Sequence, residues 1–338
     1  MKQPIKIVIP IAGYGSRMRP QTWSKPKPLI HLAGKTILDH ILDQFSTLPD
    51  NFDVEYVFIV SPHQLEQIQS HMQRKHPDKV VHLAVQEKMR GQSDALYLAR
   101  EFLNGSLLIC FSDTLAETNL AFLATEPLDG VAWVKPVEDP RRFGVAELGK
   151  DKIVTRLIEK PTEMENNLVV IGFYYLRSGE ALLEAIEIQR ERNVIRKGEF
   201  FLTDALNIFI ERGGRMRTET AEIWLDAGLP DALLETNRYL LSHGRDNSAA
   251  AAARLKGVAV IPPVYIPDSA LVETSVVGPY VSLGENVTLK DVVISNSILE
   301  DDCAVRQTLL EGSIIGRQAQ IQGKLARLNV GDNSWVAE

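Results

Sequence analysis

The stretch IPIAGYGSRMRPQTWSKPKPL, residues 9–29, decides the fold, because an apolar run ends there in a loop rich in glycine, proline and cations. Residues 5–12 are rich in β-branched side chains and predict a buried strand. In an open parallel sheet, ligands bind beyond the carboxyl ends of the strands. Backbone N–H groups of such a loop hold anionic oxygens, and arginine and lysine suit phosphate. We therefore expect Arg17 and Lys27 to hold a phosphorylated ligand.

Two familiar phosphate-binding loops do not match this stretch. The dinucleotide fingerprint has its third glycine where Met18 stands, and the P-loop pattern is absent. A solvated basic loop is the simpler alternative. Four cations near one strand end, in a chain of net charge −7, favour a binding loop instead.

Bulk composition bounds the class of protein. A chain of 338 residues is long enough for about two domains, and its acidic charge disfavours nucleic-acid binding. Cys110 and Cys303 lie in apolar, strand-like runs, which indicates buried thiols in a reducing compartment. No window holds about 18 uninterrupted apolar residues, and the first residues are too interrupted for a signal peptide. We expect a cytoplasmic protein that contacts no membrane.

Hydrophobic patterns divide the chain near residue 241. Up to that point, predicted strands at 54–60, 80–86 and 107–113 alternate with predicted helices at 36–45, 62–75 and near 93–103. This alternation predicts an α/β fold over residues 1–241, Rossmann-like, with a mostly parallel sheet flanked by helices.

The rest of the chain has a different pattern. Residues 242–257 are expected to form a linker or a fraying helix. From residue 258 aliphatic side chains recur at about every sixth position, and the period holds over successive hexads from Val281 to Val305. A six-residue repeat predicts one face of a triangular β-helix coil, so we expect a β-helix domain over 258–338. A small β-sandwich is the alternative.

The order of the motifs resembles a known family. The pattern G-x-G-S-R-M-x-P…K-P-K-P-L, from Gly13 to Leu29, resembles the signature of the sugar-1-phosphate nucleotidylyltransferases. The whole chain is most similar to the long glucose-1-phosphate thymidylyltransferases, which end in a left-handed β-helix of hexapeptide repeats. The resemblance implies a Mg²⁺-dependent enzyme, whose nucleotide would be bound by Ala12, Gly13, Gly15, Ser16 and Arg17.

Later segments resemble the family's base and metal elements. QEKMRGQSDAL, residues 86–96, implies that Gln86 and Gly91 bind the base, although Gln92 stands where the family usually has threonine. Glutamine at the first position favours a pyrimidine. CFSDT (110–114) and IWLDAGLP (223–230) imply Asp113 and Asp226 as the Mg²⁺ ligands. The pairing of two carboxylates so far apart rests on the resemblance.

Four more segments resemble the family's sugar-binding elements. They are residues 141–148, 157–161, 170–176 and 196–207. The sugar 1-phosphate would be bound by Gly144, Glu159, Lys160, Gly172, Tyr174 and Lys197. Lys197 stands where the family often has arginine, so a single ammonium would replace a fork.

These observations lead to one expected reaction. An NTP would transfer its nucleoside monophosphate to a sugar 1-phosphate and release pyrophosphate, with dTTP and glucose 1-phosphate as the first choice and Arg17, Lys27, Asp113 and Asp226 as catalytic residues. UDP-glucose synthesis, GDP-mannose synthesis and a non-catalytic regulatory homologue stay open. We also expect a homo-oligomer. The histidines show no H-x-x-x-H or Cys/His pattern, so no zinc site is predicted.

Overall fold

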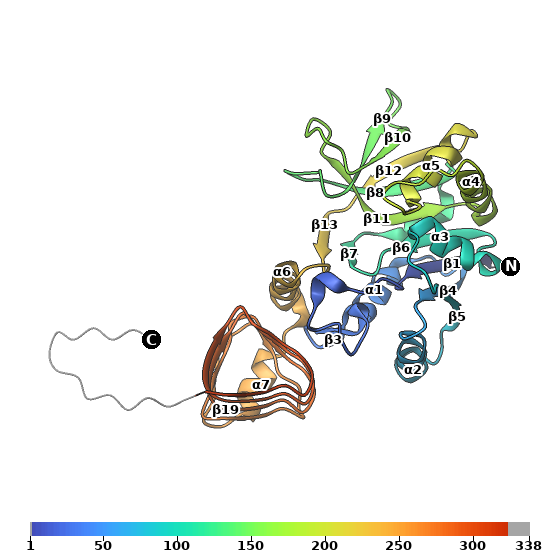
Figure 1. The fold of residues 1–338 in the computed structure, drawn as a ribbon. Helices are drawn as coiled ribbons and strands as arrows, with labels where there is room; N and C mark the ends of the chain where they lie inside the picture. Colours follow the sequence, from blue (N-terminus) through green and yellow to red (C-terminus); the bar gives the residue numbers. More distant parts are fainter. Residues whose placement is uncertain (1, 324–338) are drawn as a thin grey trace. The chain divides into compact units, whose positions relative to one another are not determined.

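The structure is a computed structural model that describes residues 2–323 (Figure 1). The chain forms two compact units. The first holds the residues up to Ile30 and Lys35–Leu233, and the second holds His31–Gly34 and the chain from Leu234 onward. The domain boundaries expected at 241 and 258 stay predictions, and residues 324–338 of the expected β-helix lie outside the described residues.

A mixed sheet organises the first unit. Its parallel part has the order β5 (Val80–Val85), β4 (Phe52–Val60), β1 (Gln3–Pro10) and β6 (Ser106–Cys110). The sheet continues through antiparallel neighbours: β11 (Leu168–Leu176), β9 (Gly144–Leu148), β10 (Val154–Glu159) and β8 (Gly130–Pro136), with β12 (Met216–Thr220) parallel to β8. The Rossmann-like fold is confirmed, and antiparallel strands extend its sheet.

Three helices of the first unit confirm the helices predicted at 36–45, 62–75 and near 93–103. The α-helices of residues 2–323 are α1 (Ile37–Asp43), α2 (Leu65–Lys75), α3 (Gln92–Leu98), α4 (Gly179–Glu191), α5 (Leu202–Glu211), α6 (Pro230–Leu240) and α7 (Ser248–Arg254). Short helical turns are η1 (Ser16–Met18), η2 (Lys27–Leu29), η3 (Gln44–Thr47), η4 (Arg100–Phe102), η5 (Leu120–Thr125) and η6 (Leu241–Arg245). Thr36 caps α1 through a reciprocal pair with Asp39, which fixes where the helix begins.

A two-stranded ribbon beside the main sheet bears on the site. Strands β7 (Thr114–Glu117) and β13 (Ile223–Asp226) pair antiparallel, with Asp226 opposite Thr114. The ribbon therefore brings the segment after β6 next to a segment more than 100 residues later. Two short strands, β2 (His31–Leu32) and β3 (Lys35–Thr36), precede α1.

Stacked parallel strands form the second unit, and their coils have a three-sided outline in Figure 1. The strands are β14 (Ala259–Val260), β15 (Val264–Tyr265), β16 (Leu271–Glu273), β17 (Val276–Val277), β18 (Val281–Leu283), β19 (Thr288–Ser295), β20 (Ile298–Leu299), β21 (Ala304–Glu311), β22 (Ile314–Ile315) and β23 (Gln320–Gln322). Aliphatic side chains fill the axis between the faces. The expected β-helix is confirmed over the described residues.

The coils are shorter than strict hexads require. Val276 pairs with Val293, and Thr288 pairs with Ala304, which are separations of 17 and 16 residues where three hexads would give about 18. The predicted inward position of Val293 is wrong, because that side chain is 45% exposed while Val292 and Ile294 are buried.

The segment expected to be a linker or a fraying helix contains a helix. Helix α7 lies within residues 242–257, and its Ala251 packs into the core of the second unit. Asn247 precedes α7 and exchanges two 2.8 Å hydrogen bonds with the backbone of Ile266. Among the described residues, no helix has the length and apolar content to cross a bilayer.

Candidate active site

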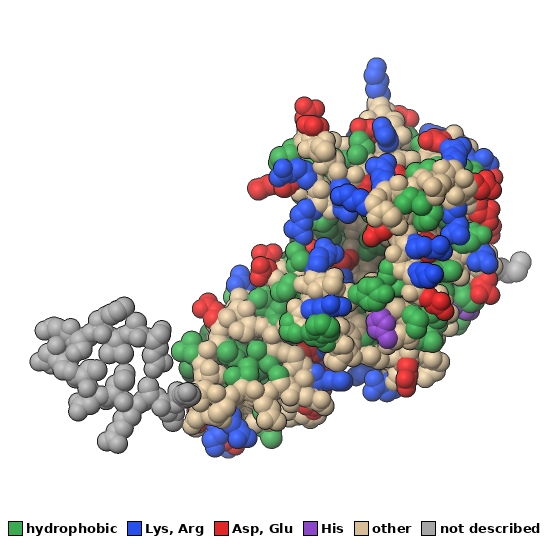
Figure 2. All heavy atoms as spheres, viewed as in Figure 1, with side chains coloured by type: hydrophobic (Ala, Val, Ile, Leu, Met, Phe, Trp, Pro, Cys, Tyr) green, Lys and Arg blue, Asp and Glu red, His purple; other side chains and the backbone are tan. Residues whose placement is uncertain are grey.

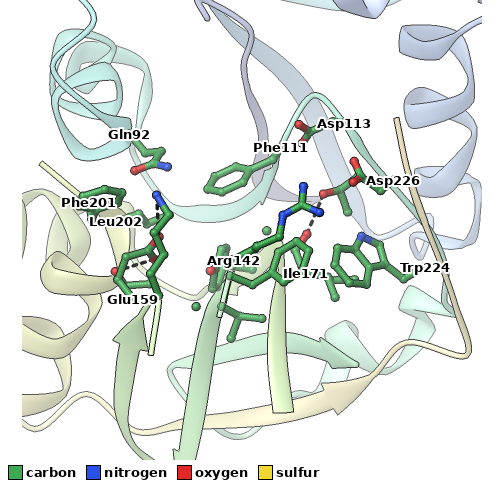
Figure 3. A pocket seen from close by; sticks show the side chains of 18 of the residues that line it. Gln92, Phe111, Asp113, Arg142, Glu159, Ile171, Phe201, Leu202, Trp224 and Asp226 are labelled. Atoms are coloured by element: carbon green, nitrogen blue, oxygen red, sulfur yellow. Dashed lines mark hydrogen bonds and ion pairs between the residues drawn. The ribbon is translucent and has the colours of Figure 1, made fainter. Parts of the chain in front are cut away.

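A cavity of about 440 Å³ in the first unit is lined by half of the predicted site residues. Figure 2 shows this face of the unit hollowed, with Lys and Arg side chains along the rim of the hollow. In Figure 3, Asp113 and Asp226 lie at one end of the pocket and Glu159 and Phe201 at the other. The predicted residues that line it are Arg17, Asp113, Gly144, Glu159, Lys160, Gly172, Tyr174 and Asp226.

The two predicted metal ligands face one small space. The β7–β13 ribbon sets Asp226 opposite Thr114, and Ala227 N donates to the carbonyl oxygen of Asp113 at 3.0 Å. A Cβ placed on Gly228 would lie 2.8 Å from Asp226 Oδ1 and 3.2 Å from Asp113 Oδ2. The carboxylates therefore converge where residue 228 has no side chain.

Charges nearby set unequal pKa values for this acidic pair. Burial alone would raise the pKa of Asp113, but Lys27, whose Nζ donates to Asp113 Oδ2 at 2.6 Å, and Arg17 hold it below its usual range. Burial and the charge of Asp113 raise the pKa of Asp226 above its usual range. Asp226 is thus the carboxylate that gains most from another cation.

These residues fit the Mg²⁺ ion that the family resemblance implies. Magnesium prefers carboxylate oxygens together with water and substrate phosphates. Asp113 and Asp226 supply two carboxylates around the space left by Gly228, and burial together with the charge of Asp113 raises the pKa of Asp226. Asp113 and Asp226 would hold the ion.

The glycine loop after β1 presents free donors. Ala12 N donates to Ile59 O at 2.9 Å, and the Gln64 side chain donates to Gly13 O at 3.1 Å, which fixes the start of the loop. Among the described residues, the backbone N–H groups of Gly13, Gly15 and Ser16 have no hydrogen-bond acceptor. Such a row of unpaired N–H groups suits anionic oxygens.

The predicted base-binding residues do not line the cavity. Gln86 is buried, and its Nε2 donates to Gly91 O at 3.4 Å and to Asp94 Oδ2 at 3.3 Å. Gly91 precedes α3 with a positive φ, and a Cβ there would lie 2.4 Å from Phe200 O. Gln92 lines the cavity instead, and its buried Oε1 has no hydrogen-bond partner among the described residues.

The opposite end of the cavity combines an acid, a base and aromatic rings. Burial raises the pKa of Glu159, and Thr203 Oγ1 donates to its Oε2 at 3.4 Å. Lys160 Nζ lies 3.9 Å from Glu159 Oε1 and 5.1 Å from the centre of the Phe201 ring. A carboxyl group that accepts and an ammonium that donates can together bind hydroxyls and a phosphate.

Glycine is required on the cavity wall at residue 172. Its φ is +78°, and a Cβ there would lie 2.5 Å from Phe111 Cδ2. Tyr174 follows on the same strand and is buried, which together with the charge of Glu159 raises the pKa of its hydroxyl. The structure therefore places Gly172 and Tyr174 in the lining of the cavity.

Lys197 and Arg196 lie elsewhere in the first unit. Lys197 is exposed in a turn and does not line the cavity. Arg196 lines a second cavity of about 320 Å³, where its Nη2 donates to Asp204 Oδ1 at 2.7 Å. Lys160 is thus the lysine of the predicted sugar-phosphate set that lines the main cavity.

Several lining residues were not among the predicted site residues. Arg142, Phe143 and Trp224 belong to segments that carried other site residues, and the buried Nε1 of Trp224 has no acceptor among the described residues. The sequence offered one signal for them: each lies within two residues of a predicted glycine or aspartate of the site. Unpaired polar atoms on Gln92 and Trp224 leave the cavity an acceptor and a donor for a ligand.

Comparison with known proteins shows the family of this chain. A family model described as nucleotidyl transferase matches residues 6–243. The bifunctional protein GlmU of Methanococcus vannielii is 33% identical over 243 residues, which are 70% of this chain and 55% of GlmU. The chain thus spans about half the length of these relatives.

Two further comparisons extend this result. The low-salt glycan biosynthesis nucleotidyltransferase Agl11 of Haloferax volcanii is 30% identical over 98% of this chain and 99% of its own. A solved structure described as a glucose-1-phosphate thymidylyltransferase from Bacillus anthracis shares the fold, with a TM-score of 0.61, 22% identity, and coverage of 72% of this chain and 96% of that one. The chain belongs to the nucleotidyl transferase family.

Proposed function

We propose that this protein transfers a nucleoside monophosphate from an NTP to a sugar 1-phosphate and releases pyrophosphate. One observation carries the proposal: a single cavity has the Asp113–Asp226 pair at one end and Glu159 with Lys160 at the other. Two separate charged ends suit a reaction between two phosphorylated substrates. Membership of the nucleotidyl transferase family supports the same reaction.

The task of the site is electrostatic. Two unit charges 4 Å apart repel by about 4 kcal/mol at an effective dielectric near 20, and several such pairs meet when a sugar phosphate attacks the α-phosphorus of a triphosphate. The protein must therefore position both substrates and neutralise their charge. Because the attacking phosphate is already ionised at neutral pH, no general base is needed.

Each cation has a distinct role in this scheme. The N–H groups of the glycine loop and Arg17 bind the β- and γ-phosphates and steady the leaving pyrophosphate. Lys27 stabilises the charge that develops at the α-phosphate. Lys160 orients the attacking phosphate. When bound by Asp113 and Asp226, Mg²⁺ supplies positive charge where the α-phosphate and the sugar phosphate meet.

The substrates proposed first are dTTP and glucose 1-phosphate. The argument for a pyrimidine rests on the sequence resemblance at Gln86 alone, because this side chain is buried and does not line the cavity. UDP-glucose and GDP-mannose synthesis by the same mechanism are the alternatives, and a non-catalytic regulatory homologue is a further one. The presence of Arg17, Lys27, Asp113, Lys160 and Asp226 disfavours the last. We also propose a homo-oligomer, which sedimentation would test.

A direct assay tests the proposal. The protein is incubated with Mg²⁺, each of five nucleoside triphosphates and either glucose or mannose 1-phosphate, and pyrophosphate release is measured. Release with one pyrimidine triphosphate and glucose 1-phosphate is expected, and Asp226→Asn serves as the inactive control. No release with any pair would favour the regulatory homologue.

A further inference from the structure

Three side chains outside the cavity converge on one point of the first unit. Asp39 lies in α1, His71 lies in α2, and His76 follows the end of α2. The Nε2 atoms of both histidines lie 2.8 Å from the same oxygen, Asp39 Oδ1. One ligand atom from each of the three residues lies within 4.8 Å of the other two.

The local structure fixes this arrangement. The other carboxylate oxygen, Asp39 Oδ2, accepts from Thr36 N at 3.1 Å and from Thr36 Oγ1 at 2.7 Å as part of the helix cap. That bonding holds the carboxylate in place and leaves Oδ1 for the imidazoles. The side chain of His71 is 7% exposed and that of His76 is 20% exposed, so the cluster is largely buried and His76 is its more accessible histidine.

The chemistry of the three groups is that of a transition-metal site. Two imidazoles and one carboxylate form a donor set that zinc and its neighbours take, whereas Mg²⁺ prefers oxygen ligands alone. The bonds from Thr36 to Oδ2 are of the kind that orient metal-binding carboxylates. The cluster differs in this respect from the acidic pair at the cavity.

We propose that Asp39, His71 and His76 bind a divalent transition-metal ion of the zinc class, with water completing its coordination. The N–O separations of 2.8 Å are shorter than the roughly 3.3 Å between ligands of a tetrahedral zinc ion, so each ring must move by about half an ångström. Each neutral imidazole then carries its proton on Nδ1 and binds through Nε2. The ion ties the start of α1 to the end of α2.

A structural role follows from the position of α1. This helix packs against η2, the turn that carries Lys27. A metal that holds α1 therefore supports the catalytic lysine without touching the cavity. The expected readouts are metal binding and thermal stability, which do not require the proposed reaction to occur.

Calorimetric titration tests the site. Untagged protein is stripped with EDTA, dialysed, and titrated with Zn²⁺ in excess Mg²⁺. One tight site per chain is expected, and His71→Gln and His76→Gln should each weaken it by at least about 100-fold. His82→Gln is the matched control, because His82 forms a single 2.5 Å pair with Glu55 and should leave binding unchanged. Asp226→Asn should also retain the site.

Cobalt gives an independent readout. Co²⁺ should produce visible absorption in the wild-type protein and lose it in His76→Gln, whose more exposed position makes that variant the safer one to fold. Zn²⁺ should raise the melting temperature of the wild type by several degrees and leave that of His76→Gln unchanged. Absence of a tight site in the wild type, or equal binding in the histidine variants, would overturn the proposal.

Discussion

Lys27 and Lys160 are two cations of the cavity region with different proposed tasks. Lys27→Ala should lower kcat by about 10²–10³ with a small change in KM, because its charge acts at the α-phosphate in the transition state. Lys160→Ala should raise the KM for the sugar phosphate by at least about tenfold. Steady-state kinetics separate the two effects. Lys150→Ala, at an exposed lysine outside the lining, is the control.

Asp226 is expected to lower the stability of the folded protein at neutral pH although the proposed reaction requires it. Its raised pKa means that the folded protein binds the proton more tightly than the unfolded chain, so stability falls as pH rises from the ordinary value through the raised one. Asp226→Asn removes that loss and keeps an oxygen for Gly228 N, which donates to Asp226 Oδ1 at 2.6 Å.

The expected result has two parts. Without Mg²⁺ at pH 7, Asp226→Asn should melt a few degrees higher than the wild type while losing at least about 100-fold in activity. Thermal scans between pH 4 and 7 should show that the melting temperature of the wild type falls relative to that of the variant as the pH rises. A variant that melts lower at pH 7 would contradict the assigned repulsion.

At the scale of elements, the β7–β13 ribbon makes the acidic pair. Gly228→Ala would put a methyl group into the space between the carboxylates, so we expect at least tenfold lower activity and a higher Mg²⁺ requirement. Gly316→Ala is the control, because a Cβ there meets nothing within 4 Å. Titration of activity with Mg²⁺ compares the two variants. Equal Mg²⁺ requirements would place the ion elsewhere.

Two neighbouring valines of the second unit test which side chain of the coil is buried in its core. Val292→Ala should destabilise the protein by about 2 kcal/mol, because it removes buried apolar groups and leaves a cavity. Val293→Ala should change stability by less than about 0.5 kcal/mol, because Val293 is partly exposed. Denaturant unfolding measures both. A larger loss of stability in Val293→Ala than in Val292→Ala would instead support a strict six-residue period with Val293 inward.

The limits of prediction differ between the elements. Periodicity predicted the β-helix, but a strict six-residue period also placed Val293 inward. The paired strands are 16 or 17 residues apart where three hexads would give about 18, and a list of aliphatic residues does not show this shortening. Residues Asp39 and His71 are 32 positions apart on different helices. No spacing rule joins them, so the sequence predicted no zinc site, and only the folded chain brings them together.

At the scale of the whole molecule, strand–helix alternation was enough to predict the parallel strands β1, β4, β5 and β6 of the first unit, because each period has a physical cause in burial. It did not predict that antiparallel β11 would lie beside β6, since pairing direction depends on connections far along the chain. The convergence of Asp113 and Asp226 likewise needed the resemblance. The alternation of strands and helices in the sequence identifies the elements. Which strands pair, and which distant side chains meet, depends on the three-dimensional arrangement.

Residues His31–Gly34 give the second unit a discontinuous chain. Ala33 N donates to Ser282 Oγ at 3.2 Å, and His31 N donates to Glu300 Oε1, a fully buried carboxylate, at 3.2 Å. A fragment cut at residue 234 would lack both donors. Anyone who grafts this tail onto another enzyme, or exchanges it by recombination at a single crossover, must therefore transplant a tetrapeptide from near the amino terminus as well.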